Sequence, residues 1–100
     1  MDLSVYKVEE IKKILSPVFK QNGVKSAILF GSYAKGNARV KSDIDLCVDS
    51  GLIGLDFLGL IEYIHIALKK KVDVFDVRSI IKGSEIEQEI KKYGIKIYGW

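Results

Sequence analysis

The chain has 100 residues, of which 48% are hydrophobic and 29% charged, a composition typical of a globular domain. Its 16 basic and 13 acidic residues leave a formal net charge of +3, far below the charge of a dedicated nucleic-acid-binding domain. At this length we expect a single domain, residues 1–100, whose site is an open groove, because a small core cannot also enclose a deep cavity.

Cysteine usage and the distribution of apolar residues predict a cytoplasmic protein. Cys47 is the single cysteine, so the chain cannot form an internal disulfide. The first ten residues, MDLSVYKVEE, lack the basic and apolar regions of a signal peptide. The most apolar stretch, from Leu52 to Leu68, is interrupted by Asp56, Glu62 and His65, and we therefore interpret it as a core helix and not as a membrane span.

The first predicted element is an amphipathic helix from Val5 to Asn22. Its apolar residues recur every three or four positions, and charged residues occupy the positions between them. Ser4 is the expected N-cap, and Pro17 is expected to kink the last turn or to begin a new one. The almost wholly apolar run from Ser26 to Phe30 then predicts a strand that is covered on at least one face.

A small, polar and basic loop from Gly31 to Ser42 follows, with a short helix expected from Ser32 to Lys35. The next predicted strand, from Asp43 to Val48, alternates acidic and apolar residues. One face of this strand therefore belongs to the core, and the other face carries carboxylates. The face that carries carboxylates comprises Asp43, Asp45 and Cys47.

A second long helix is expected from Leu55 to Lys70, with a buried apolar stripe along one side. The stripe would comprise Leu58, Ile61, Ile64 and Leu68. The segment from Val72 to Val77 is β-branched and aromatic, which predicts a third strand.

The last predicted elements are a short helix and an edge strand. Ser84 followed by Glu87 is a capping-box pattern that opens the helix, and Gly94 ends it. The run from Ile95 to Tyr98 can close the sheet at its edge. The order helix, strand, strand, helix, strand, helix, strand predicts an α+β fold, with a small mixed β-sheet, helices packed on one face and the other face available for chemistry.

The residues suited to chemistry lie where two predicted strands meet the loop between them. Gly31-Ser32 ends the first strand, and ten residues separate it from Asp43-Ile44-Asp45. Asp43 and Asp45 share a face, so their carboxylates repel each other unless a cation lies between them. Two metal ions about 3.5–4 Å apart would neutralise both and hold the attacking and leaving oxygens of a phosphoryl displacement. Mg²⁺ suits such a site because it prefers oxygen ligands.

The loop after the first strand has the residue types that bind phosphate. Gly31 lets the backbone approach closely, the Ser32 hydroxyl can donate a hydrogen bond, and free amides at the start of the short helix attract anions. The basic residues Lys35, Arg39 and Lys41 lie in the same loop and can neutralise a triphosphate.

A third carboxylate is available on the later strand, either Asp73 or Asp76. Successive residues alternate faces, so these two side chains point to opposite sides and only one of them can join the pair. We favour Asp73, partly because it opens its strand as the other two aspartates open theirs.

The segments FGSYAKG, SDIDL and KVDV resemble the minimal nucleotidyltransferases of the DNA polymerase β superfamily. That family is marked by Gly-Ser, ten residues, Asp-x-Asp and a third aspartate, and the resemblance extends over nearly the whole chain. It implies a polymerase β-like palm fold. It also implies that Gly31 and Ser32, together with Lys35, bind the phosphates of a nucleoside triphosphate. The loop has Ala-Lys-Gly where the family usually has Ala-Arg-Gly, so Lys35 would contact phosphate as a point charge.

The same resemblance implies the roles of the three aspartates and the biological partner. Asp43 and Asp45 would bind both Mg²⁺ ions, and Asp73 would bind one ion and orient or deprotonate the acceptor hydroxyl. Proteins of this length in the family resemble antitoxins encoded beside a HEPN-domain ribonuclease, some of which add AMP from ATP to a tyrosine of that toxin. The alternative is a non-catalytic, nucleotide-binding antitoxin that neutralises its partner by sequestration.

Overall fold

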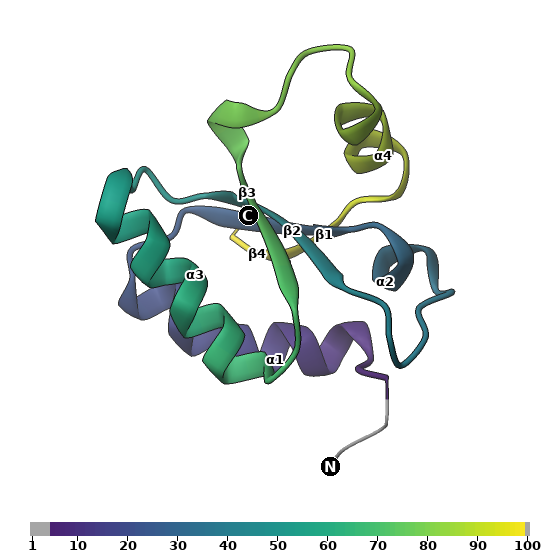
Figure 1. Cartoon of the computed structure of the whole chain (residues 1–100), viewed down its shortest axis with the longest axis horizontal. Helices are drawn as coiled ribbons and strands as arrows, with labels where there is room; N and C mark the ends of the chain where they lie inside the picture. Colours follow the sequence, from purple (N-terminus) through teal and green to yellow (C-terminus); the bar gives the residue numbers. More distant parts are fainter. Residues whose placement is uncertain (1–4, 100) are drawn as a thin grey trace.

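The computed structural model describes residues 5–99, so the expected N-cap Ser4 lies outside the described residues. These residues form a small sheet with helices on both sides (Figure 1). In chain order the elements are α1 (Val8–Gln21), β1 (Ser26–Phe30), α2 (Ser32–Lys35), β2 (Ile44–Asp49), α3 (Gly54–Leu68), β3 (Val72–Asp76), the 3₁₀ turn η1 (Val77–Ser79), α4 (Glu85–Tyr93) and β4 (Ile95–Tyr98). None of the helices in this part of the chain combines the length and the apolar character that crossing a membrane requires.

The sheet is mixed, as predicted, and its strand order is β3-β2-β1-β4. β1 is antiparallel to both β2 and β4, whereas β2 and β3 are parallel. Parallel neighbours need a long crossover connection, and α3 provides it. In this strand order, β1, which leads into the Gly-Ser turn, and β2, which carries the Asp-x-Asp motif, are the two central strands.

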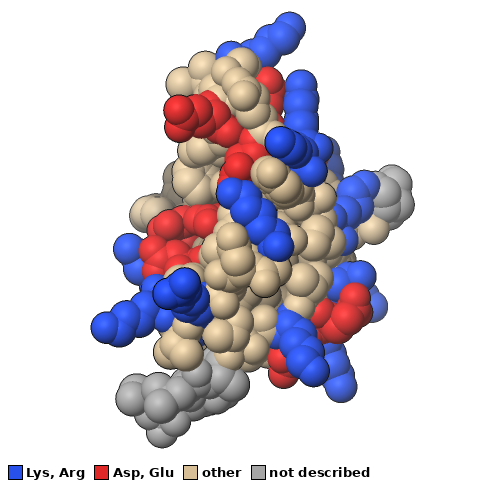
Figure 2. All heavy atoms as spheres, turned by 90° about the vertical axis from the view of Figure 1, so that its right-hand side faces the viewer, with Lys and Arg blue, Asp and Glu red and all other residues tan. Residues whose placement is uncertain are grey.

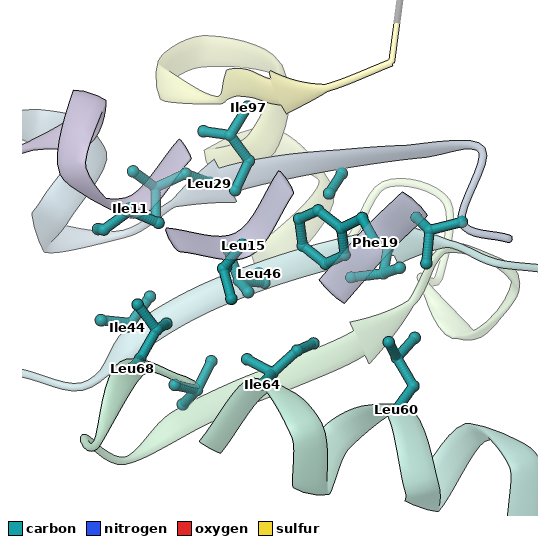
Figure 3. Close-up of a cluster of buried hydrophobic side chains, with 14 of the residues drawn as sticks. Ile11, Leu15, Phe19, Leu29, Ile44, Leu46, Leu60, Ile64, Leu68 and Ile97 are labelled. Carbon is teal, nitrogen blue, oxygen red and sulfur yellow. The ribbon is translucent and has the colours of Figure 1, made fainter. Parts of the chain in front are cut away.

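The hydrophobic core lies between the sheet and the two long helices, α1 and α3 (Figure 3). Fully buried side chains from both helices meet the apolar residues of the strands, as the alternation in β2 predicted. The largest contributors are Ile11, Leu15, Phe19, Leu29, Ile44, Leu46, Leu60, Ile64 and Leu68, with Ile97 at the edge. This packing fixes which side of the sheet remains for a site.

α1 begins three residues later than the sequence pattern predicted. Its N-cap is Lys7, whose backbone N–H donates to the Glu10 carboxylate over 2.8 Å. The helix continues through Pro17 to Gln21. The Glu10 carboxylate thus satisfies the backbone donor of the N-cap residue, while the Lys7 side chain has no acceptor with which to cap the first turn.

The predicted buried stripe of α3 was wrong at Leu58, and Ile61, another predicted member, is only partly buried. The Leu58 side chain is 59% exposed, and Leu60 is fully buried in its place, together with Ile64 and Leu68 as expected. The helix is apolar around most of its circumference, with Tyr63 and other exposed apolar residues on the outer side. Periodicity alone therefore could not select the side that meets the core.

α4 lies on the opposite side of the sheet from α1 and α3 (Figure 1), so the expected packing of the helices on one face holds for the two long helices only. The Ser84 hydroxyl accepts from the Glu87 N–H over 3.2 Å, which confirms Ser84 as the N-cap. The Glu87 carboxylate accepts from the Gly83 N–H over 2.8 Å and not from that of Ser84, so the predicted capping box forms only in part. At the other end, a Cβ on Gly94 would stand 2.8 Å from Cγ2 of Ile28 in β1. This glycine lets the end of α4 sit directly on the sheet face that carries the acidic residues.

Candidate active site

Gly31 joins β1 to α2 with φ 73° and ψ −154°, a conformation that is essentially restricted to glycine. A Cβ at this position would also overlap Oδ2 of Asp45. The sequence analysis expected a close approach between Gly31 and a ligand. The structure places its backbone directly against a carboxylate of the Asp-x-Asp motif, so the turn and the motif form one site.

Asp45 and Asp73 are paired residues of the parallel β2–β3 ladder. Paired residues on neighbouring strands present their side chains on the same face, so two carboxylates stand side by side. Burial raises the pKa of Asp45 to about 6, and the negative charges of Asp73, Asp43 and Glu89 add to this effect. The charged neighbours that shift the pKa of Asp45 are thus all carboxylates, which add to the negative charge of the site.

Asp43 lies just before β2, two residues from Asp45, and the alternation of the strand places it toward the same side. Its Oδ2 is 3.5 Å from Nζ of Lys71, the residue before β3. The Lys71 side chain is 73% exposed, so solvent screens this ion pair and it contributes little stability. Asp43 is thus only weakly held by its neighbour.

Asp76, the sequence alternative to Asp73, occupies a different position. It pairs with Val48, which belongs to the core-facing set of β2. Its carboxylate accepts hydrogen bonds from the backbone N–H of Arg78 over 2.8 Å and from Nη2 over 2.6 Å. These bonds lower the pKa of Asp76. The placement therefore favours Asp73 as the third carboxylate of the site.

The basic residues of the loop are not all directed toward the aspartates. Nζ of Lys35 is 2.5 Å from Oε1 of Glu89 in α4 and 5.1 Å from the centre of the Tyr93 ring. The side chains of Arg39 and Lys41 belong to exposed residues in the connection from α2 to β2. Of the three predicted phosphate contacts, Lys35 is the one that the fold brings next to another charged group of the site.

Glu89 is a residue of this region that the sequence analysis did not identify. It lies close enough to Asp45 to raise the pKa of that carboxyl, and it is the ion-pair partner of Lys35. The sequence pattern predicted the helix that carries it. That pattern held no signal for the face of the sheet on which the helix packs, because that choice depends on contacts distant in the chain.

The three aspartates offer the type of ligand atom that a divalent cation such as Mg²⁺ prefers. In residues 5–99, no three His, Cys, Asp or Glu side chains are placed closely enough to enclose a metal ion. However, Asp43, Asp45 and Asp73 offer only oxygen ligands toward one side of the sheet, which is the chemistry that Mg²⁺ prefers. Burial, followed by the charges of the neighbouring carboxylates, raises the pKa of Asp45, so the ionised form of this side chain is disfavoured in the folded chain.

The α2 end of the molecule carries both signs of charge. Figure 2 shows Lys and Arg side chains spread over this face, with acidic side chains gathered in a few groups between them. A surface of this kind can meet an anionic group through its basic residues and a cation through its carboxylates.

Comparisons with known proteins agree with this chemistry. The family model described as Polymerase beta, Nucleotidyltransferase matches residues 9–99. The protein adenylyltransferase MntA of Thermococcus cleftensis is 34% identical over 87 residues, which cover 81% of this chain and 88% of that protein.

Solved structures share the fold. A chain from a toxin–antitoxin complex with AMP-PNP superposes with a TM-score of 0.73 at 26% identity, over 89% of this chain and 73% of that chain. A Shewanella oneidensis complex of a tri-AMPylated HEPN toxin with an MNT antitoxin gives a TM-score of 0.68 at 23% identity, over 93% and 73% of the two chains, and shows likeness of fold alone. Because the family model matches residues 9–99, almost the entire chain, the chain belongs to the polymerase β nucleotidyltransferase family.

Proposed function

We propose that the chain is a Mg²⁺-dependent adenylyltransferase that transfers AMP from ATP to a tyrosine hydroxyl of a HEPN-domain toxin and so acts as its antitoxin. The observation that carries the proposal is the pairing of Asp45 with Asp73 against the backbone of Gly31. Two similar chains support the finer assignment: one is the protein adenylyltransferase MntA of Thermococcus cleftensis, and the other belongs to a toxin–antitoxin structure with AMP-PNP.

In the proposed reaction the acceptor oxygen attacks the α-phosphorus of ATP. A new P–O bond forms to the acceptor, the bond between the α-phosphorus and the bridging oxygen breaks, and pyrophosphate leaves with that oxygen. Asp43, Asp45 and Asp73 would hold Mg²⁺, which when bound supplies positive charge to the transferring phosphate and the leaving group. Asp73 orients the acceptor hydroxyl and accepts its proton.

The turn after β1 contributes to the binding of the leaving group. Gly31 has no side chain, so the pyrophosphate portion can approach the backbone closely. The hydroxyl of Ser32, the first residue of α2, donates a hydrogen bond to a phosphate oxygen. Lys35 supplies a positive charge at the end of the same short helix, once it is released from Glu89.

The test is the transfer of label from [α-³²P]ATP to a HEPN-domain protein encoded beside this chain, in the presence of Mg²⁺. Asp45→Asn should lower the rate by at least about a hundredfold, because a metal ligand and its charge are lost. Asp49→Asn is the matched control, since it lies on the same strand about 13 Å farther along. Equal rates for wild type and Asp45→Asn would refute the enzymatic proposal.

A second candidate function is neutralisation of the toxin by sequestration. The observation in its favour is that Lys35, a predicted phosphate ligand, is paired with Glu89. Co-expression of the toxin with equal doses of wild type or Asp45→Asn separates the two functions. If the Asp45→Asn form protects cells as well as wild type does, sequestration is sufficient, whereas loss of protection requires the modification.

A further inference from the structure

A groove of about 310 Å³ lies between β3 and the start of α4. Its lining residues are Phe75, Ser79, Ile80, Ile81, Ser84 and Ile86. Four of the six side chains are apolar, two carry a hydroxyl group and none is charged. The groove is formed by β3, by the first turn of α4 and by the segment between them. That segment includes η1 and is the arch of chain visible in Figure 1.

The floor of the groove is continuous with the candidate active site. Phe75 follows Asp73 by two positions in β3, so both side chains lie on the same face, about 7 Å apart along the strand. The Phe75 ring packs on Phe30, with 5.6 Å between the ring centres. Phe30 in turn is the ladder partner of Asp45. Phe75 therefore connects the groove to the sheet face that carries the paired carboxylates.

The chemistry of the proposed transfer indicates which reactant this groove receives. The uncharged lining gives a triphosphate no partner, and the Gly31 turn that suits the leaving pyrophosphate lies at the end of β1. In an in-line displacement the attacking oxygen enters opposite the leaving group. The strand order β3-β2-β1 places the groove on the β3 side of Asp45, away from Gly31. The groove is therefore on the acceptor side.

We propose that this groove binds the acceptor segment of the protein partner by receiving an aliphatic or aromatic side chain next to the hydroxyl that is modified. Ile81 is the principal contact at its rim. This side chain is 74% exposed, although it lines an apolar groove, and it gains from burial against a partner. The inference rests on the proposed transferase function and specifies how the acceptor is selected.

The experiment measures the KM for the HEPN-domain protein and the KM for ATP separately in Ile81→Asp. We expect the KM for the acceptor protein to rise about tenfold or more, with the KM for ATP unchanged within about twofold. Ile81→Leu should retain wild-type values. The matched control is Ile66→Asp, which places the same charge at a residue that is 61% exposed on α3, outside the groove.

Two results would overturn this assignment. A rise in the KM for ATP alone would show that the groove holds the nucleotide, and an equal loss in Ile81→Asp and Ile66→Asp would show that the groove has no special role. Binding of the acceptor protein, measured by calorimetry in the Asp45→Asn background, provides a readout without turnover. If wild type transfers no label, the proposed transferase function is refuted. Weaker binding of the acceptor protein by the Ile81→Asp form would still support the groove as its binding site, whereas unchanged binding would refute that assignment.

Discussion

The Nζ atom of Lys35 lies 2.5 Å from Oε1 of Glu89, so an ion pair links the loop after β1 to α4. Both side chains are about one-third exposed, at 33% and 30%. The hydrogen bond to Glu89 raises the pKa of Lys35, and the same carboxylate adds to the effects that raise the pKa of Asp45. Glu89 thus holds a predicted phosphate ligand and adds negative charge near a predicted metal ligand.

This relationship predicts that Glu89→Gln binds ATP more tightly. The substitution releases Lys35 for the phosphates and removes one negative charge near the site, so we expect the KM for ATP to fall about threefold to tenfold. Lys35→Ala should raise the KM for ATP by a similar factor. Glu85→Gln, an exposed position on the same helix, is the control. Weaker ATP binding in Glu89→Gln would instead show that Glu89 assists the metal ligands.

Gly31→Ala should damage both stability and activity. An alanine here must adopt a glycine-only conformation, and its Cβ must displace the Asp45 carboxylate, so we expect a loss of about 2–4 kcal/mol in the free energy of unfolding. Gly36→Ala is a sharp control, because Gly36 also has a positive φ, of 81°, but a Cβ there would have no neighbouring atom within 4 Å. It should cost only about 1 kcal/mol. Chemical denaturation measures both values, and equal losses would contradict the predicted clash.

Asp45 should make the metal-free protein less stable as the pH rises. Its pKa is raised from 3.8 to about 6, so the folded state disfavours the charged form. The penalty is absent well below pH 3.8, grows as the pH rises toward about 6, and is complete above that pH. Allowing for screening at a half-buried group, it amounts to about 1–2 kcal/mol.

Asp45→Asn removes this penalty and should therefore be more stable than wild type at about pH 7.5, by about 1–2 kcal/mol, with little difference at about pH 3.5. Urea denaturation in the presence of EDTA at the two pH values measures the difference. A variant that is less stable than wild type at the higher pH would show that the charge of Asp45 is compensated in the folded protein.

Asp73→Asn and Asp76→Asn should have different effects. Asp73 faces Asp45, so its substitution is expected to lower the rate of transfer by at least about a hundredfold, with little change in stability. Asp76 is bound to Arg78 on the other side of the strand, so Asp76→Asn should leave the rate within about threefold of wild type. The reverse order of rates would exchange the roles of the two residues.

Most of the secondary structure was predictable from the sequence, because its signals lie within single segments. The alternation from Asp43 to Val48 predicted a strand that runs from Ile44 to Asp49, and Ser84 caps the helix that it was expected to begin. The helix from Ser32 to Lys35 was also predicted within its observed bounds. The buried side of α3 was not predictable, since apolar residues such as Leu58 and Leu60 occupy both sides of that helix.

Local sequence was enough to indicate the nucleotidyltransferase family, because the Gly-Ser pair, the Asp-x-Asp motif and the spacing between them are properties of one short segment. Packing in three dimensions was needed to establish that Asp73 lies beside Asp45, that Glu89 pairs with Lys35 and that Phe75 lines an apolar groove. These relations depend on the register of two strands and on the side of the sheet where α4 packs. Both are set by burial of residues far apart in the chain, which no local pattern encodes.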